Sequence, residues 1–477
     1  MASLMAPIES CPIRWQAIHH SQHIAFKTDN QPISYLQLDN LLIQLQAQLE
    51  NKINTTGDHI IRLVCISPNS VELLLLQLVC LRMGWCFCPI NPRFTATEVN
   101  QRLKLLNSDY CWVNDDSPHQ KFNTLKIDFD LQAREINDQL SLLPIIPEQA
   151  CNIIFTSGSS GFPKAIVHNY RNHFYSALGS QDHIPLVIGD HNLLSLPLFH
   201  IGGYATVIRT MIAGASLHLS NQPLTFPLLQ ERQITHLSLV STQLVRLLED
   251  PKFTKAQSSI KHILLGGSAF PRQLLSSLVE RDFNYHLSYG CTEMASQVAT
   301  STNSEALTIL PYREVKIDNE VILLRGETRF LGYFKNNKLV ELDAKQWINI
   351  GDTGQLNENI VTILGRQDRQ FISGGENIRP EEIEQTCLQQ SNIKQAYASP
   401  INDTQYGQRV VLFVEFEAQK HLTFEQQSKQ LQHYLQKKLT TFKQPDYYLP
   451  WPQSNSNQAL KIPKAIFETI LKNKGLI

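Results

Sequence analysis

A strand–helix–strand pattern in the first hundred residues restricts the fold of this chain more than any other feature. The β-branched run HIIRLVCIS (59–67) precedes the apolar helical run VELLLLQLVCLRMG (71–84), and WCFCPINP (85–92) has the pattern of another buried strand. Two such strands joined by a helix are expected to pair in parallel. The pattern predicts an α/β fold, and strand-like runs at 151–155 and 261–267 continue it.

Beyond about residue 310 the pattern changes to short strands interrupted by Asn, Asp, Glu and Gly. The stretches REVKIDNEVILLRGE (313–327) and QLNENIVTILGRQDRQFI (355–372) are typical of hairpins. We expect a helix from Pro380, because proline and the acidic residues after it suit the first turn of a helix. A strand over 408–417 and an amphipathic helix over 424–439 complete the prediction of a small α+β unit.

The length of 477 residues is too great for one compact core, so more than one domain is expected. We place the boundary within GRQDRQ (365–370), where the hairpins end. The prediction is a large N-terminal domain of layered α/β subdomains over residues 1–367. A small, mobile α+β domain over residues 368–477 follows it.

Composition and charge exclude several classes of protein. The formal net charge of −1 gives no electrostatic footprint for nucleic acid or for an acidic membrane. Nine scattered cysteines, several of them in apolar runs, indicate reduced buried thiols and no structural metal site. The N-terminal stretch does not have the pattern of a signal peptide, and residues 71–84 fall short of the roughly 20 apolar residues of a spanning helix. We therefore expect a cytoplasmic protein without membrane insertion. A homo-oligomer is compatible with the sequence, which does not fix the oligomeric state.

The stretch FTSGSSGFPKAIVHN (155–169) places a loop of glycines and serines, followed by a lysine, directly after an apolar run. Backbone N–H groups and hydroxyls in such a loop can converge on an anion, so the stretch could hold phosphate. It is not a Walker A loop, because Gly158 and Gly161 are three residues apart and Pro163 precedes Lys164. An ordinary turn between two elements is the alternative for the loop taken alone.

Six further segments accompany this loop. In chain order they are LPLFHIGG (196–203), LLGGSAFP (264–271), SYGCTEMAS (288–296), NIGDTGQL (349–356), GRQDRQFISGGENIRPEEIE (365–384) and ALKIPKAIFE (459–468). In this order and spacing they resemble the adenylate-forming superfamily of acyl- and aryl-CoA ligases, luciferases and peptide-synthetase adenylation domains. Within it, LSLPLFHIGGY, ILLGGSAFP and FISGGENIRPEEIE are similar to the versions in the o-succinylbenzoate–CoA ligases of menaquinone biosynthesis.

The resemblance implies a reaction in two halves. A carboxylate attacks the α-phosphate of ATP to give an acyl-adenylate and pyrophosphate, and the thiol of CoA then displaces AMP after the small domain has rotated. The partners implied are a small aromatic acid, ATP and CoA. Mg²⁺ is the implied cofactor, since it suits a site with one or two carboxylates and phosphate oxygens.

The same resemblance assigns the ATP site. In SYGCTE, Tyr289 would flank the adenine, Thr292 would contact the α-phosphate and Glu293 would hold Mg²⁺. Gly267 and Ser268 would let the backbone approach the purine, with a plain left-handed turn as the alternative. The residues implied at the β- and γ-phosphates are Thr156, Ser157, Gly158, Ser159, Ser160, Gly161 and Lys164.

Residues near the predicted domain boundary would complete the nucleotide site and would form the hinge and the loop that faces CoA. Asp352 would accept hydrogen bonds from the ribose hydroxyls, unless it is an ordinary turn aspartate, and Arg366 would support the ribose or the phosphates. Asp368 matches the hinge position of the superfamily. Gly374 and Gly375 would lie on the loop that faces the pantetheine of CoA.

The lysine implied in adenylation is Lys461, which matches the superfamily by its distance from the C-terminus and by the following IPKAIF. The residue before it is Leu460, where the superfamily usually has glycine, and Lys464 is the competing candidate. A long cationic side chain at this place would reach the charge that develops between carboxylate and α-phosphate.

The acid is expected to lie near three residues. His200 closes LPLFH and is expected beside the acid, a satisfied core histidine being the alternative. Arg209 lies in an apolar helical run, where an internal acidic partner or a position at the helix edge would be the ordinary explanation. In the ligases that the chain resembles, an arginine at the matching place points to a role in binding the ring carboxylate of o-succinylbenzoate, with Thr242 lining the same pocket.

The sequence leaves open three alternatives to an o-succinylbenzoate–CoA ligase. The acid could be a fatty, coumarate-like or benzoate-like one, or the chain could be a freestanding adenylation domain that loads a carrier-protein thiol. A non-catalytic nucleotide-binding relative is the third. The intact phosphate loop, Glu293 and Asp352 argue against this last alternative.

Overall fold

The computed structural model describes most of the chain. The described residues are 5–29, 31–53, 60–119, 125–131, 140–157, 163–267, 270–373, 376–417, 422–452 and 464–477, with only the backbone described at Ser157 and Asn377. Within these ranges no helix is both long enough and apolar enough to cross a membrane.

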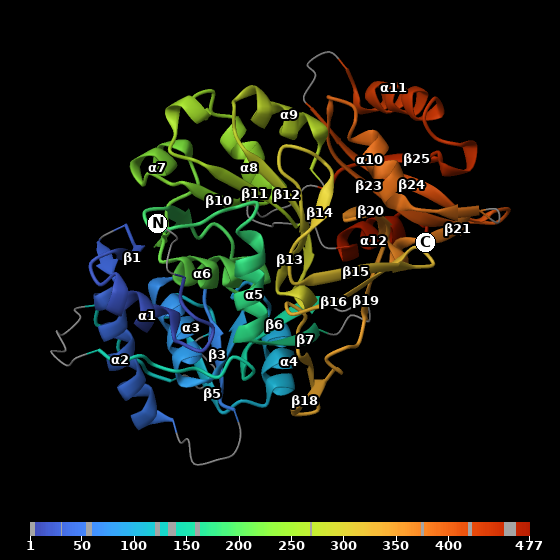
Figure 1. Ribbon diagram of the computed structural model, residues 1–477. Coiled ribbons are helices and arrows are strands. Elements are labelled where there is room, and N and C mark those ends of the chain that lie inside the picture. Colours follow the sequence, from blue (N-terminus) through green and yellow to red (C-terminus); the bar gives the residue numbers. More distant parts are fainter. Residues whose placement is uncertain are drawn as a thin grey trace.

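Two large sheets form the first three quarters of the molecule (Figure 1). One has seven described strands, of which β3, β4, β5 and β6 pair in parallel, and β7 and β17 continue it antiparallel. In sheet order the strands are β18 (Lys338–Glu341), β17 (Gly332–Lys335), β7 (Pro163–Asn169), β6 (Ala150–Ser157), β4 (Cys86–Ile90), β3 (Arg62–Ile66) and β5 (Tyr110–Val113).

The other sheet has thirteen described strands and joins a parallel half to an antiparallel half. The parallel half contains β8, β9, β10, β11 and β12. The hairpins predicted after residue 310 form the antiparallel half together with β13 and β14. In sheet order the strands are β15 (Arg313–Asp318), β16 (Val321–Gly326), β19 (Ile348–Asn357), β20 (Ile360–Arg366), β14 (Leu307–Ile309), β13 (Ser296–Thr300), β12 (Tyr285–Cys291), β11 (His262–Leu265), β10 (His236–Leu239), β8 (His191–Leu193), β9 (Ser216–His218), β1 (Ile24–Lys27) and β2 (Pro32–Ser34).

Helices fill the space between the two sheets and cover their outer faces. The helices of this part are α1 (Pro12–His19), α2 (Tyr35–Lys52), α3 (Val71–Met83), α4 (Ala96–Leu106), α5 (Tyr170–Ser180), α6 (Ile201–Ala213), α7 (Phe226–Glu231), α8 (Ser241–Leu248) and α9 (Arg272–Glu280). One core cluster contains side chains of α2, α3 and α6 together with Phe87 of one sheet and Phe26 and Leu217 of the other. A helix that is apolar on all sides, as α3 is, is stable only in such a buried layer.

Local sequence determines how helix α2 begins, and a buried ion pair compensates the charge within helix α3. Helix α2 begins with a capping box, in which Gln37 N donates to Ser34 Oγ at 3.2 Å and Ser34 N donates to Gln37 Oε1 at 2.8 Å. The buried Arg82 of α3 pairs with Asp39, which also lies 2.9 Å from Arg14 Nε. The charge that interrupts the apolar helix is therefore compensated inside the core.

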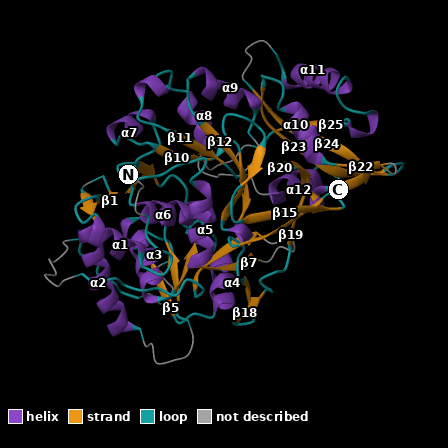
Figure 2. Ribbon diagram, in the orientation of Figure 1, coloured by secondary structure: helices purple, strands orange, loops and turns teal. Residues whose placement is uncertain are grey.

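The last hundred residues form a separate α+β unit, seen at the upper right of Figure 2. Its core clusters contain only residues between 371 and 476. The elements are β21 (Phe371–Ser373), β22 (Glu376–Ile378), α10 (Pro380–Cys387), β23 (Ile393–Asp403), β24 (Gly407–Phe416), α11 (Phe424–Gln436), β25 (Tyr447–Pro450) and α12 (Lys464–Asn473). The predicted α/β class with a small C-terminal α+β part is confirmed.

Candidate functional site

The predicted phosphate loop lies between two antiparallel strands. Strand β6 ends at Ser157 and β7 begins at Pro163, and their ladder places Thr156 opposite Lys164. The hydroxyl and the ammonium group thus start from neighbouring positions at the mouth of the loop. Residues Gly158, Ser159, Ser160 and Gly161 lie outside the described residues. The contacts of Thr156 and Lys164 with phosphate therefore stay a prediction.

The SYGCTE motif lies where β12 passes into a short 3₁₀ turn, Thr292–Met294. A Cβ on Gly290 would lie 1.9 Å from Ser296 O, so only glycine lets β13 approach β12 this closely. On the other side, the His168 ring bonds to Thr292 O at 2.7 Å, and Phe330 N donates to Glu293 O at 2.9 Å. His168 lies on β7, so this strand and the SYGCTE turn are held together.

Glu293 is a buried carboxylate, 9% exposed, that has no ion pair within the described part of the chain. Burial raises its pKa, while the charges of Lys164 and Arg366 act in the opposite direction. A desolvated oxygen ligand beside a predicted phosphate site has the chemistry that a hard cation such as Mg²⁺ prefers. The residues present therefore fit the implied metal.

Asp352, Tyr289, Arg366 and Asp368 form a connected chain of polar groups. The Tyr289 hydroxyl donates to Asp352 Oδ2 at 2.7 Å, and Arg366 Nη1 lies 3.0 Å from Asp352 Oδ1. Arg366 Nε lies 3.2 Å from Asp368 Oδ1. Burial and the adjacent Asp352 raise the pKa of Tyr289, so the phenol stays a hydrogen-bond donor. Asp352 lies inside β19 and not in its turn, which excludes the ordinary turn explanation.

Two further residues that are predicted to lie at the nucleotide, Gly267 and Ser268, follow β11. Gly267 has a φ of +88°, the left-handed conformation that the alternative explanation required. A Cβ there would meet only Val240 Cγ1, at 3.6 Å, so the backbone is also open to approach. The structure thus leaves both explanations of Gly267 in place, and Ser268 lies outside the described residues.

On the acid side, a tightly held loop leads to helix α6. His200 is the N-cap residue of α6 and is exposed, so it is not a core histidine. The amide of Asn69 donates to Leu196 O and accepts from Leu198 N, both at 2.9 Å. A Cβ on Gly203 would lie 2.1 Å from Pro197 O, which explains the second glycine of FHIGG.

Arg209 lies in the middle of α6 and is 8% exposed, so its head is neither at the helix edge nor in water. Its guanidinium donates to Gln297 Oε1 at 3.1 Å, and no described carboxylate forms an ion pair with it. Burial lowers its pKa to about 10, so it stays charged at neutral pH. A cavity of about 10 Å³ beside it, also lined by Asn192 and His236, is about the size of one water molecule. Among the described residues, neither ordinary explanation of Arg209 therefore holds.

Thr242 lies in the first turn of α8, next to Gln243. Gln243 Nε2 donates to Ser195 O at 2.9 Å, so this turn supports the loop that carries His200. Neither Thr242 nor Arg209 is hydrogen-bonded to the Asp352 chain within the described residues. The assignment of Thr242 and Arg209 to the acid, and of the Asp352 chain to the nucleotide, stays a prediction.

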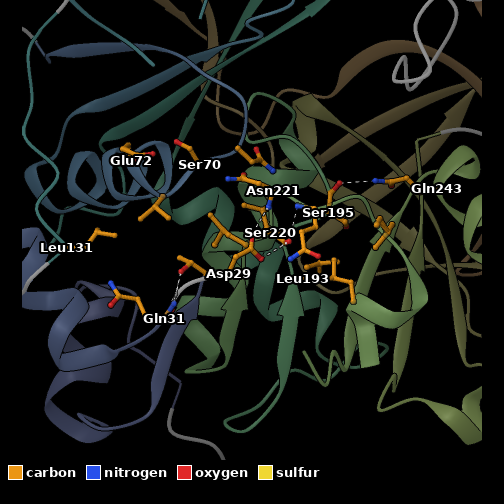
Figure 3. A pocket seen from close by; sticks show the side chains of 18 residues that line it. Asp29, Gln31, Ser70, Glu72, Leu131, Leu193, Ser195, Ser220, Asn221 and Gln243 are labelled. Atoms are coloured by element: carbon orange, nitrogen blue, oxygen red, sulfur yellow. Dashed lines mark hydrogen bonds between the residues drawn. The ribbon is translucent and has the colours of Figure 1, made fainter. Parts of the chain in front are cut away.

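A larger cavity of about 580 Å³ lies next to the loop that leads to α6, between β1, α3 and the loops after β8 and β9 (Figure 3). Asp29, Ser70, Glu72, Asn221 and Gln243 line it, and the Gln243–Ser195 hydrogen bond is seen at its edge. None of its lining residues belongs to the predicted site. The chemistry argues for the motif residues and not for this cavity, because they bring a buried carboxylate, an arginine and a lysine together.

The predicted hinge and tail residues are only partly described. Asp368 is exposed and lies in the 3₁₀ turn Gln367–Arg369, between β20 and the C-terminal unit. Its pKa is lowered, because the hydrogen bond and charge of Arg366 outweigh the opposing effect of burial. Gly374, Gly375 and Lys461 lie outside the described residues. Lys464 begins α12, is 64% exposed and lies 3.3 Å from Glu468 Oε1.

The sequence did not indicate three residues that contact the predicted site residues or the loop before α6, namely Asn69, His168 and Gln297. Their partners are 127, 124 and 88 residues away along the chain. His168 follows the phosphate loop by four residues, and only this proximity could have drawn attention to it.

Comparison with known proteins gives consistent results. A family model described as AMP-binding enzyme matches residues 13–327. The 2-succinylbenzoate–CoA ligase of Haemophilus influenzae is 33% identical over 91% of this chain and 92% of its own. That of Escherichia coli is 34% identical over 83% and 84%. A solved structure of an E. coli MenE variant with bound OSB-AMS has a TM-score of 0.83 at 28% identity and covers 98% of this chain and 100% of its own.

Proposed function

The chain belongs to the AMP-binding enzyme family, and from this membership we propose that it is a 2-succinylbenzoate–CoA ligase. It activates o-succinylbenzoate with ATP and transfers the acyl group to CoA. Relatives of that name cover most of the chain, and a similar solved structure holds OSB-AMS. ATP and CoA are metabolites of the cytoplasm, where we place the reaction.

The observation that carries the choice of acid is the buried guanidinium of Arg209, whose described hydrogen-bond partner is the neutral amide of Gln297. A buried charge without a counter-charge is costly, and a carboxylate from a ligand would relieve that cost. o-Succinylbenzoate has two carboxylates, and the succinyl one must stay free to react. Arg209 therefore binds the ring carboxylate, and Thr242 and His200 line the same side.

In the first half-reaction an oxygen of the succinyl carboxylate attacks the α-phosphorus of ATP, and the bond to pyrophosphate breaks. Asp352 accepts hydrogen bonds from the ribose, Tyr289 flanks the adenine, and Thr292 contacts the α-phosphate. Glu293 would hold Mg²⁺, which supplies charge neutralisation at the phosphates when bound. Lys164, Thr156 and the rest of the loop hold the leaving pyrophosphate. Lys461 stabilises the charge at the reacting atoms.

In the second half-reaction the sulfur of CoA attacks the acyl carbon, the thiol proton is lost, and AMP leaves. The domain boundary lies between residues 367 and 368, and rotation about Asp368 exchanges Lys461 for the Gly374–Gly375 loop. The separate hydrophobic cores on the two sides of this point support such a boundary. The Arg366–Asp368 contact supports a hinge at this position.

A panel of acids tests the proposal. Pyrophosphate release is measured with o-succinylbenzoate, benzoate, p-coumarate and a medium-chain fatty acid, each with and without CoA. We expect o-succinylbenzoate to give the highest kcat/KM, and sustained turnover only with CoA. A preference for another acid would replace the substrate. Adenylate formation without use of CoA would favour the carrier-protein alternative.

A further inference from the structure

Within the part of the chain that the structure describes, the polar groups around Arg209 are neutral. Asn192 donates its amide to Thr210 Oγ1 at 2.9 Å. Burial lowers the pKa of the neighbouring His236 to about 4, and its ring nitrogens bond to Thr235 Oγ1 and Pro185 O. The remaining polar partner is Gln297. The described residues thus surround the guanidinium without neutralising it.

Gln297 is held so that its oxygen faces Arg209. Its Nε2 donates to Thr300 Oγ1 at 3.0 Å, and its Oε1 accepts from Arg209 at 3.1 Å. An arginine has no acceptor, so the carbonyl oxygen of the amide must be the atom that faces it. Both ends of the amide are fixed by buried partners, and a rotation would break two hydrogen bonds.

The backbone of Gln297 is fixed by a second arginine. Arg313 Nε donates to Gln297 O at 2.9 Å, and its other nitrogens donate to Tyr175 O, Pro311 O and Ser176. A Cβ on Gly179 would lie 2.0 Å from Arg313 Nη1, so glycine at this place in α5 leaves room for that guanidinium. Helix α5 and strand β15 together therefore set the position of Gln297 on β13.

We propose that Gln297 is a positioning residue that aims the Arg209 guanidinium at the ring carboxylate of the substrate while leaving its positive charge uncompensated. A glutamate of the same shape would hold the guanidinium equally well but would compete with the substrate for it. The amide therefore determines specificity for an acid with a second carboxylate. This inference rests on the proposed function.

The test compares two acids in three variants. The acids are o-succinylbenzoate and 4-oxo-4-phenylbutanoate, which has the same succinyl chain and lacks the ring carboxylate. The variants are Gln297→Glu, Gln297→Met and Arg209→Leu. The measurement is kcat and KM for pyrophosphate release at saturating ATP. Circular dichroism and the thermal midpoint report folding.

We expect Gln297→Glu to raise KM for o-succinylbenzoate at least tenfold and to change KM for 4-oxo-4-phenylbutanoate less than twofold. kcat for both acids should stay within about twofold. Gln297→Met should raise KM for o-succinylbenzoate severalfold, since the guanidinium is no longer aimed. Arg209→Leu should remove the preference for o-succinylbenzoate and leave the KM for ATP unchanged.

An equal rise in KM for both acids in Gln297→Glu, or no rise in either, overturns the inference. If Gln297→Glu does not fold, Thr300→Val decides, because it removes the hydroxyl that fixes the amide and should raise KM for o-succinylbenzoate alone. The proposed function fails separately, namely if the wild-type protein does not turn over o-succinylbenzoate. If Arg209→Leu loses the preference for o-succinylbenzoate but the Gln297 and Thr300 variants keep it, Arg209 alone selects the acid and the role proposed for Gln297 is overturned.

Discussion

Arg366 and Asp352 face each other across the β19–β20 ladder, and Arg366 Nη1 lies 3.0 Å from Asp352 Oδ1. The same guanidinium lies 3.2 Å from Asp368, the predicted hinge residue. One arginine therefore connects the predicted ribose acceptor with the point about which the small domain is proposed to turn. Binding of the nucleotide and the orientation of the domain would be coupled through it.

Replacing Arg366 should affect the nucleotide much more than the acid. In Arg366→Gln, Asp352 loses its ionic partner while Tyr289 still donates to it. We expect KM for ATP in pyrophosphate release to rise about tenfold, corresponding to about 1.4 kcal/mol, while KM for o-succinylbenzoate stays within twofold. Arg325→Gln is the matched control, because Arg325 is also a strand arginine paired with a carboxylate, Glu314. Equal effects of the two substitutions on KM for ATP would contradict the assignment.

Lys461→Ala should abolish most formation of the acyl-adenylate and leave the conversion of supplied adenylate and CoA largely intact. The physical reason is that a lysine acting on the α-phosphate is needed in one domain orientation only. Lys464→Ala should stay near wild type, since the exposed Lys464–Glu468 pair contributes little. Each half-reaction is measured separately by rapid quench. The opposite pattern would assign adenylation to Lys464.

Asp368→Pro should slow one half-reaction at least tenfold more than the other. Proline fixes φ, so the chain could no longer exchange between two conformations at this residue. Asp368→Ala is the control, since it removes the contact with Arg366 and retains backbone rotation. A uniform loss in both half-reactions, or none, would remove the hinge from residue 368.

Three histidines on neighbouring parallel strands should make stability depend on pH. The rings of His236 and His262 lie 5.1 Å apart, and His262 Nδ1 lies 2.9 Å from His286 Nε2. Burial, followed by the neighbouring histidines, lowers the pKa of His286 to about 3, against 6.5 for the ordinary side chain. Between these values the unfolded chain binds a proton that the folded chain does not. The contribution of His286 to the free energy of unfolding is therefore complete above pH 6.5 and is lost as the pH falls toward 3.

The measurement for His286 is urea unfolding at pH 7.5 and pH 5.5. Between the two pH values the wild type should lose more free energy of unfolding than His286→Gln, by up to about 1.4 kcal/mol. The reason is that the variant has no imidazole at this position to take up a proton on unfolding. Only the pH dependence is compared, since the substitution also removes hydrogen bonds to His262 and Thr302. Equal losses in the two proteins would show that His286 titrates alike in both states.

The parts of the fold that the sequence predicted well are those with local causes. The helix predicted from Pro380 is present, because its start depends on residues a few positions apart. The hairpins after residue 310 depend likewise on local turns, such as Asn319 and Glu320 with φ of 48° and 63°. The order of strands in the large sheet depends on pairing between distant segments, and the sequence pattern carries no record of it.

The same distinction holds for the site. Glu293 and Tyr289 lie in one short motif, so their proximity follows from the sequence itself. Gln297 and Asn69 act on segments far along the chain, and their residue types are ordinary for a strand and a loop. Arg209 could be singled out as a charge in an apolar run, but its neutral partner could not be foreseen.

The most direct test of the account follows the oxygens of the acid. o-Succinylbenzoate labelled with ¹⁸O only in the succinyl carboxylate is mixed with the protein, ATP, Mg²⁺ and CoA, and the products are analysed by mass spectrometry. We predict that one labelled oxygen appears in AMP and the other in the thioester carbonyl of o-succinylbenzoyl-CoA. Pyrophosphate should form in an amount equal to that of AMP. Unlabelled AMP, or ADP and phosphate in place of AMP and pyrophosphate, would contradict activation of this carboxylate through an acyl-adenylate.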